Sequence, residues 1–235
     1  MDSEDVSPSR IKKAKFELSQ LINSLDGDKV AIIVFAGSSH LYLPLTSDYD
    51  AALLFLNQID TGIIPTKGTN LKSAFITALS SFSDEKNIHK VLLLVSDGED
   101  HEGEMIDLSK KASKNGFIIN TVGVGSSSGS LIPIKNNKDQ STTFKRDKNG
   151  KLVTSVLNIQ NLRDIAYAGN GDFFWFDNNR DTYKDILFKI NNMEKKTIST
   201  HEYSEYENRY QLFALVALFL LMIGFFMPTR LKIIN

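Results

Sequence analysis

The feature that most constrains the fold of this chain is an unbroken apolar run at residues 91–95 that turns polar immediately afterwards. Five such residues are too few for an ordinary helix and are rich in strand formers, which predicts a strand buried on both faces, as in a parallel sheet. Ser96, Asp97 and Gly98 follow, and open α/β sheets bind ligands at this carboxyl end of their strands. A candidate site is therefore expected at Asp97, although an ordinary polar turn there stays an open alternative.

Strand and helix patterns alternate along most of the remaining chain. Apolar residues at helical spacing, opened by cap-forming residues such as Ser7, Ser47 and Thr69, predict helices at residues 8–26, 47–59, 69–82, 105–115, 161–168 and 182–196. Strands are predicted at residues 29–36, 40–43, 117–124 and 172–176. Such alternation predicts a doubly wound, mostly parallel α/β sheet with helices on both faces. Because the pattern begins with a helix, we expect that a strand is missing upstream of Ser7.

One segment departs from this alternation. Residues 131–157 contain short alternating stretches on either side of Asn149 and Gly150, and Asn-Gly is the strongest local signal for a hairpin. We interpret the segment as a β-hairpin inserted into a domain of residues 1–197.

The C-terminal segment has a composition of its own. Residues 212–227 contain no charged or strongly polar side chain, so a helix formed by them has no face to present to water. Tyr210 before the segment and Arg230 and Lys232 after it suit the two membrane interfaces. We therefore predict a linker at residues 198–209, a transmembrane helix at 210–228 and a short tail at 229–235, with a buried core helix as the alternative. The two cations after the segment favour a cytoplasmic tail.

Composition excludes several classes of function. The chain has 27 Lys and Arg residues against 28 Asp and Glu residues, so its net charge of -1 predicts no nucleic-acid partner. It has no cysteine, which excludes disulfides, thiolate metal sites and a cysteine nucleophile. The polar, acidic start of the sequence does not have the pattern of a signal peptide.

An enzyme is the less favoured class. Residues 125–129, Gly-Ser-Ser-Ser-Gly, match the G-x-S-x-G pattern of α/β hydrolases, but a nucleophile elbow leads directly into a helix, whereas Pro133 follows closely here. No glycine-rich phosphate-binding loop follows any predicted strand. We therefore expect a binding protein without a small-molecule substrate, with a hydrolase using the 125–129 loop as the alternative.

Two oxygen-bearing side chains are expected to converge at the carboxyl end of the sheet. Asp97 follows the central strand, and Thr69 opens the helix that leads into that strand. A carboxylate and a hydroxyl form part of a site for a hard cation such as Mg²⁺, which prefers oxygen ligands in octahedral geometry. Two ligands are too few by themselves, and Thr69 as a helix cap and Asp97 as a turn residue remain open alternatives.

Several motifs resemble those of a known family. The motifs GTNL at 68–71, VSDGED at 95–100 and NTVGVGS at 120–126 resemble a von Willebrand factor A domain. More narrowly, the chain resembles the BatA/BatB aerotolerance-type bacterial membrane proteins in EDVSPSR at 4–10, KAK at 13–15, SDGEDHEGE at 96–104, FKRDKNGKLV at 144–153 and the apolar tail. The similarity extends over essentially the whole chain.

This resemblance implies a fold, a site and a class of partner. It implies a doubly wound sheet with a metal-ion-dependent adhesion site, in which a DxSxS motif on the first strand joins a threonine and an aspartate, here Thr69 and Asp97. It implies Mg²⁺ as the cofactor, but the DxSxS strand has no counterpart in this sequence, so we expect an N-terminally truncated member with an incomplete site and two unpaired strand edges.

The same resemblance implies a function in the cell envelope. It implies a non-enzymatic protein-interaction module in the bacterial inner membrane, with its domain in the periplasm and other cell-envelope proteins as partners. We expect the partner to bind at the acidic loop after the central strand, through Glu99, Asp100, His101 and Glu102.

Overall fold

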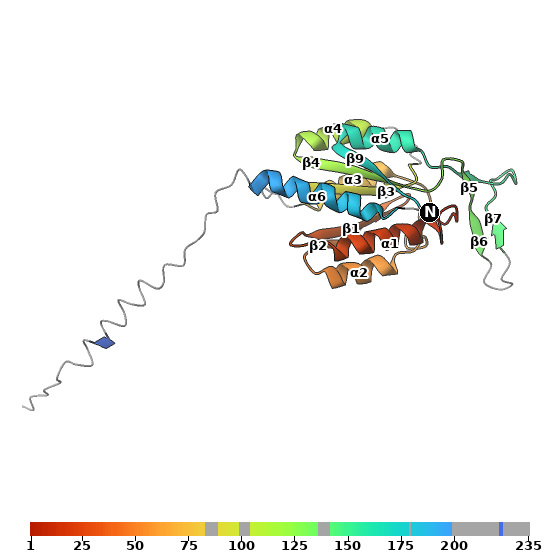
Figure 1. The fold of residues 1–235 in the computed structure, drawn as a ribbon. Coiled ribbons are helices and arrows are strands. Elements are labelled where there is room, and N and C mark those ends of the chain that lie inside the picture. The colour runs from red at the N-terminus through yellow and green to blue at the C-terminus, as the bar shows by residue number, and fades with distance from the viewer. Residues whose placement is uncertain (83–88, 99–103, 136–141, 179, 199–220, 223–235) are drawn as a thin grey trace, which may run out of the picture. The chain divides into compact units, whose positions relative to one another are not determined.

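The computed structural model describes residues 1–82, 89–98, 104–135, 142–178, 180–198 and 221–222 (Figure 1). The chain divides into two units, Met1–Lys195 and Lys196–Asn235. The fold described below is that of the first unit.

A parallel sheet forms the centre of this unit. It consists of β3 (Lys90–Ser96), β4 (Phe117–Val124) and β9 (Asn170–Phe176), in the order β3-β4-β9. The apolar run at residues 91–95 lies in β3, as its composition predicts, and β4 lies between the other two strands. A second, antiparallel sheet pairs β1 (Val30–Phe35) with β2 (Ser39–Thr46).

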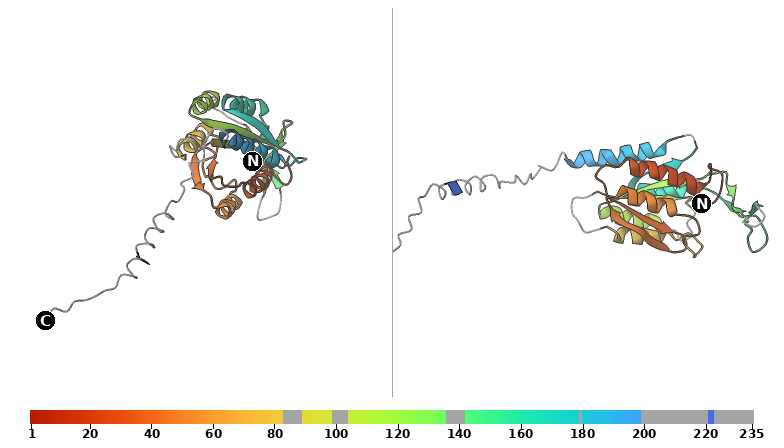
Figure 2. Two further views of the ribbon diagram at one scale, coloured as in Figure 1. Left: turned by 60° about the vertical axis from the view of Figure 1, so that its left-hand side comes forward. Right: turned by 90° about the horizontal axis from the view of Figure 1, so that it is seen from below.

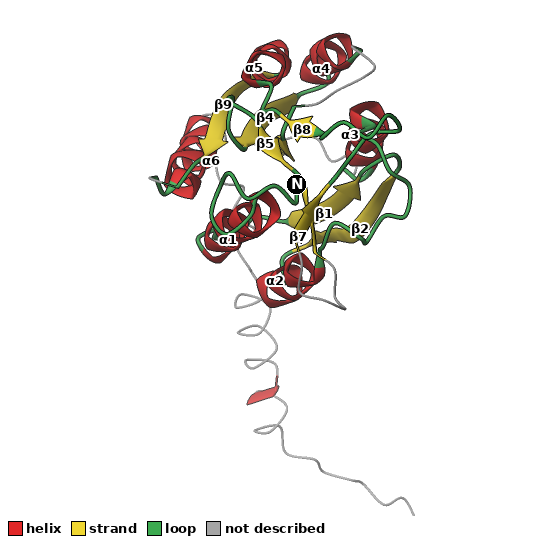
Figure 3. Cartoon of the chain, turned by 90° about the vertical axis from the view of Figure 1, so that its right-hand side faces the viewer, coloured by secondary structure: helices red, strands yellow, loops and turns green. Residues whose placement is uncertain are grey.

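Helices cover both faces of the strands. The helices that begin in the described part of the first unit are α1 (Arg10–Asn23), α2 (Tyr49–Gln58), α3 (Leu71–Ser80), α4 (Met105–Lys114), α5 (Ile159–Ala168) and α6 (Thr182–Ile198). Figure 3 shows α3, α4 and α5 on one side of the strands and α1, α2 and α6 on the other. The buried apolar residues divide in the same way, because one cluster joins Phe75 and Met105 to Ile119 and another joins Ala14 and Ile186 to Val122. This confirms the predicted doubly wound α/β arrangement.

The pairing of β4 with β9 contains a bulge that depends on one buried amide. Between Ile119 and Thr121 the register advances by one extra residue on β9, from Asn170 to Phe173. The Asn120 side chain is fully buried there, and its Oδ1 accepts a hydrogen bond of 2.9 Å from the backbone N–H of Asp172. The polar side chain thus satisfies a backbone donor that the bulge takes out of the ladder.

The facing edges of β1 and β3 differ from the interior of a continuous sheet. Among the described residues, the ladder pairs β1 with β2 alone and β3 with β4 alone. The side chains of residues 91–93 are only half-buried, whereas nearly all of those in β4 are buried. The expectation that this run is covered on both faces is confirmed, because Leu92 and Leu94 belong to one apolar cluster and Leu93 and Val95 pack against the other. Its side chains are less fully buried than those of β4, because β3 has a neighbouring strand on one side alone in the described structure.

Hydrogen exchange tests whether the edge of β3 that faces away from β4 lacks a strand partner. We expect the alternate amides of β3 that point away from β4 to exchange faster than the amides of β4, by on the order of 100-fold, because they have no strand partner in the described structure. The amides of β3 that pair with β4 provide the internal control. Uniform protection along β3 would contradict the prediction, since it would require a bonding partner on that edge.

A small antiparallel β-insert projects from the carboxyl end of the sheet (Figures 1 and 2). It contains the short strands β5 (Ser130–Leu131), β6 (Pro133–Lys135), β7 (Thr142–Phe144) and β8 (Thr154–Ser155), with β5 paired to β8 and β6 paired to β7. Between β7 and β8 the chain turns at Asp147, whose Oδ1 accepts hydrogen bonds from the backbone N–H groups of Asn149 and Lys151. A β-hairpin is thus present where the Asn-Gly pattern indicates one.

The fold class predicted from the sequence is wrong in one part, the transmembrane helix. Among the described residues, no helix is both long and apolar enough to cross a membrane. The longest, α6, has 17 residues and carries charged side chains such as Lys184 and Asp185, which need contact with water. Apart from Leu221 and Met222, the predicted span at 210–228 lies outside the described residues.

Candidate functional site

The candidate site lies at the carboxyl end of β3, where Asp97 follows the last residue of the strand. The Asp97 side chain is 13% exposed, and its Oδ2 lies 3.3 Å from Nη1 of Arg10. The same oxygen accepts a long hydrogen bond of 3.4 Å from the Ser155 hydroxyl and lies 3.9 Å from the α-amino group of Met1. The backbone carbonyl of Asp97 accepts a hydrogen bond from Asn158, the residue that caps α5. Asp97 is therefore more than a turn residue, because its carboxylate is part of an ion pair.

Arg10 is the centre of this site, and its side chain is completely buried. Its guanidinium forms a bidentate ion pair with Asp5, with hydrogen bonds from Nε to Oδ1 at 2.8 Å and from Nη2 to Oδ2 at 2.7 Å. Further contacts go to Asp97 and to Ser155, whose hydroxyl accepts from Nη1 at 2.8 Å and whose carbonyl accepts from Nη2 at 3.1 Å. We call Arg10, Asp5, Asp97 and Ser155 the Arg10 cluster.

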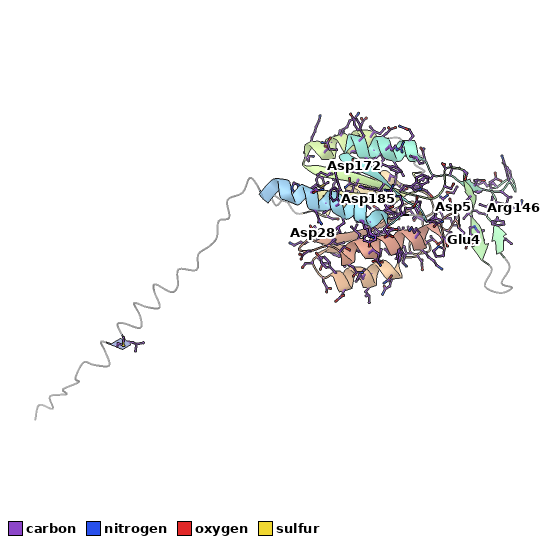
Figure 4. The ribbon with its side chains drawn as sticks, in the orientation of Figure 1. Glu4, Asp5, Asp28, Arg146, Asp172 and Asp185 are labelled. Atoms are coloured by element: carbon purple, nitrogen blue, oxygen red, sulfur yellow. The ribbon has the colours of Figure 1, made fainter. Side chains whose placement is uncertain are left out.

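The Arg10 cluster joins four separate parts of the chain. Asp5 belongs to the segment before α1, Asp97 follows β3, and Ser155 belongs to β8 of the insert. The loop after β4 is attached through Ser126, whose backbone N–H donates to Oδ2 of Asp5 at 2.7 Å. Asp5 lies at the end of the sheet from which the insert projects (Figure 4). One guanidinium thus holds together the loops at the carboxyl end of the sheet.

The charge state of Asp5 follows from these contacts. Burial by itself raises the pKa of the Asp5 carboxyl, but the hydrogen bond from Arg10 and the backbone hydrogen bond from Ser126 outweigh it and hold the pKa below its usual range. Asp5 is therefore ionised at neutral pH and balances the charge of Arg10.

Gly125 allows Arg10 to occupy this position. Its φ of +128° is one that residues with a side chain rarely adopt, and a Cβ built on it would lie 2.5 Å from Cζ of Arg10. The backbone at the end of β4 thus packs directly against the guanidinium.

Sequence reasoning missed Arg10, Asp5 and Ser155. One signal for Arg10 was available, because a cation in the first turn of a helix opposes the helix dipole and so needs carboxylates nearby. Asp5 lies close by in the sequence, within the EDVSPSR motif, but Ser155 is separated from Arg10 by 145 positions and no local pattern marks it.

The structure describes only some of the residues that the sequence predicts to form the site. Thr69 lies just before Asn70, and Asn70, not Thr69, caps α3 by accepting a hydrogen bond of 2.8 Å from the backbone N–H of Ser73. The alternative of Thr69 as a helix cap is therefore wrong. The predicted partner-binding residues Glu99, Asp100, His101 and Glu102 lie outside the described residues.

The 125–129 loop does not have the geometry of a nucleophile elbow. It closes with a hydrogen bond from the Gly129 N–H to the Ser126 carbonyl and leads into strand β5 rather than into a helix. The Ser126 and Ser128 hydroxyls bond to each other at 2.6 Å. This loop thus gives no support to the hydrolase alternative.

Comparisons with known proteins agree with this fold. The family model of the von Willebrand factor type A domain matches residues 1–99. The conserved hypothetical protein BatB from Bacteroides thetaiotaomicron is 35% identical, with a TM-score of 0.78, over 83% of this chain and 93% of that one. An aerotolerance-related membrane protein from Bacteroides fragilis is 37% identical, with a TM-score of 0.76, over 82% of this chain and 94% of that one.

A more distant structure shares the fold alone. The manganese-loaded TRAP protein of Plasmodium vivax is 16% identical, with a TM-score of 0.55, over 80% of this chain and 68% of that one. No curated protein matches the chain. On the match to the two Bacteroides structures and to the family model, the chain belongs to the von Willebrand factor A proteins of the BatB, aerotolerance-related type.

Proposed function

We propose that this chain is a protein-interaction module that captures another cell-envelope protein at the carboxyl end of its sheet, without catalysing a reaction. The observation that supports this most is the Arg10 cluster, because its Arg10–Asp5 ion pair contacts Asp97 at the end of β3, Ser126 in the loop after β4 and Ser155 at the base of the insert. Loops fixed in this way by a sheet are typical binding surfaces. The cell envelope is proposed because one close relative is an aerotolerance-related membrane protein.

The chemistry of the cluster favours binding over catalysis. Two carboxylates at this end of the sheet, Asp5 and Asp97, are in contact with a guanidinium that carries its charge at all physiological pH values. Asp5 in particular is a poor general base, because the contacts from Arg10 and Ser126 hold the pKa of its carboxyl below the usual range.

A metal ion of the kind implied by the family does not fit the described residues. Asp5 and Asp97 supply carboxylates that Arg10 already contacts, and the part of the chain that the structure describes contains no group of three or more His, Cys, Asp or Glu residues able to hold a metal. Mg²⁺ releases its water reluctantly and needs more anionic oxygen than these two carboxylates supply while they are paired with a guanidinium. We therefore derive no role for a bound cation.

The β-insert is the second candidate for the partner surface. It exposes four large apolar side chains, Ile134, Phe144, Leu152 and Val156, at 39% to 49% of their surface. Exposed apolar residues gathered on one small element are typical of interaction sites. The neighbouring cations Lys145, Arg146, Lys148 and Lys151 would favour an acidic partner.

Site-specific photo-crosslinking in the native host distinguishes the two surfaces. We expect a crosslinker at position 101 to capture an envelope protein, and the double substitution Asp100→Ala, Glu102→Ala to lower the yield several-fold by removing charge from the binding loop. A crosslinker at position 115, at the opposite end of the sheet before β4, is the control and should capture nothing. Adducts formed only from position 148 would assign binding to the β-insert and contradict the loop as the binding surface.

A further inference from the structure

Arg10 places a positive charge directly beside the carboxylate of Asp97. Its Nη1 contacts Oδ2 of Asp97, and its Nε and Nη2 contact both oxygens of Asp5. Oδ2 of Asp5 also accepts the Ser126 N–H, and Oδ2 of Asp97 also accepts the Ser155 hydroxyl. Three of the four oxygens of these two carboxylates are therefore already engaged by donors of the protein.

The guanidinium cannot easily give way to a metal ion. It remains protonated in proteins, so a change of pH does not remove its charge. Its side chain is fully buried and packs against the backbone of Gly125, where a single added carbon atom would lie 2.5 Å from Cζ. A divalent cation bound to Asp97 would therefore lie beside a fixed positive charge and would share its carboxylate with that charge.

We infer that Arg10 is the built-in counter-cation of this site, so that a guanidinium, and not a divalent metal ion, neutralises Asp97 and Asp5 in this chain. Three groups around Arg10 carry hard oxygen donors, namely Asp5, Asp97 and the Ser155 hydroxyl. Whether a metal ion can bind to them therefore depends on the side chain at position 10. A consequence for partner capture, which rests on the proposed function, is that chelators do not affect it.

Calorimetric titration of the full chain with MnCl₂ tests the inference without any partner. We expect no binding by the wild-type chain up to about 1 mM, the concentration at which weak oxygen-ligand sites are filled. Arg10→Gln removes the guanidinium from between the part-buried carboxylates of Asp5 and Asp97, so we expect Mn²⁺ affinity to rise by about tenfold or more and to be lost again in Arg10→Gln, Asp97→Asn. Arg10→Lys retains the charge and is the matched control, for which we expect no binding.

Each result has a defined meaning. Binding by the wild-type chain that is abolished by Asp97→Asn would overturn the inference, and so would equal binding by Arg10→Gln and Arg10→Lys. If Arg10→Gln is unfolded without metal, its circular dichroism should recover on addition of Mn²⁺, and failure to recover would count against the donor set. Because these measurements involve no partner, failure of the crosslinking experiment leaves them unaffected.

Discussion

Arg10→Met is expected to lower the free energy of unfolding by about 3–5 kcal/mol, the usual cost of removing one member of a buried ion pair. Methionine retains most of the length of the side chain, so the loss is mainly electrostatic. Asp5 and Asp97 would keep their part-buried positions but lose the guanidinium, and Ser155 would lose the donors to its hydroxyl and its carbonyl. The change is measured by urea denaturation followed by circular dichroism.

Arg180→Met is the matched control for this substitution. Arg180 pairs with Asp185 at 3.5 Å, but the two side chains are 72% and 54% exposed. A surface pair of this kind contributes about 0–1 kcal/mol, so the control should change stability little. If both arginine substitutions cost the same, the Arg10 cluster does not hold the loops together and its role in this site is wrong.

Gly125→Ala should destabilise the chain by about 3 kcal/mol or more, because it combines two separate costs. A φ of +128° strains any residue with a side chain by about 1–3 kcal/mol, and the new Cβ would lie 2.5 Å from Cζ and Nε of Arg10. The guanidinium would have to move and would weaken its hydrogen bonds to Asp5. Thermal and urea unfolding of the purified variant measure the combined effect.

Gly116→Ala separates the two costs. Gly116 also has a positive φ, of +83°, but a Cβ there would meet no atom within 4 Å, so we expect a loss of only about 1–2 kcal/mol from backbone strain. In an Arg10→Met background the clash at Gly125 should shrink, and the two substitutions should therefore be less than additive. Full additivity would show that the close approach of Gly125 to Arg10 does not contribute to the cost.

The sequence by itself determined the helices, strands and turns that depend on a local pattern of residues. The apolar run in β3, the helical spacing in α1 and α3 and the Asn-Gly turn of the insert all express periodicity or turn chemistry within a few neighbouring residues. Cap positions differ by one or two residues: Ser9 precedes α1 where Ser7 was predicted, Asp48 caps α2 where Ser47 was predicted, and Asn70 caps α3 where Thr69 was predicted. Such shifts arise because adjacent polar residues are nearly equivalent as caps until the chain around them is placed.

Asp97 could be located from the sequence, but its surroundings could not. Its place after a buried strand follows from the abrupt change of polarity at residue 96, which is a local signal. Its partner Arg10 lies 87 positions away, and Ser155 is 145 positions from Arg10. The identity of the cation beside Asp97 depends on how distant segments meet, and this is decided by packing.

Tertiary structure alone decided three further features of this protein. Asn120 is buried because a bulge between β4 and β9 leaves a backbone donor for its amide to satisfy. The side chains of residues 91–93 in β3 are half-buried because burial of a strand depends on its neighbours and not on its own composition. Position 125 has no room for a side chain, because the guanidinium of Arg10 packs against its backbone. This contact joins two residues that are far apart in the chain, so no local pattern predicts it.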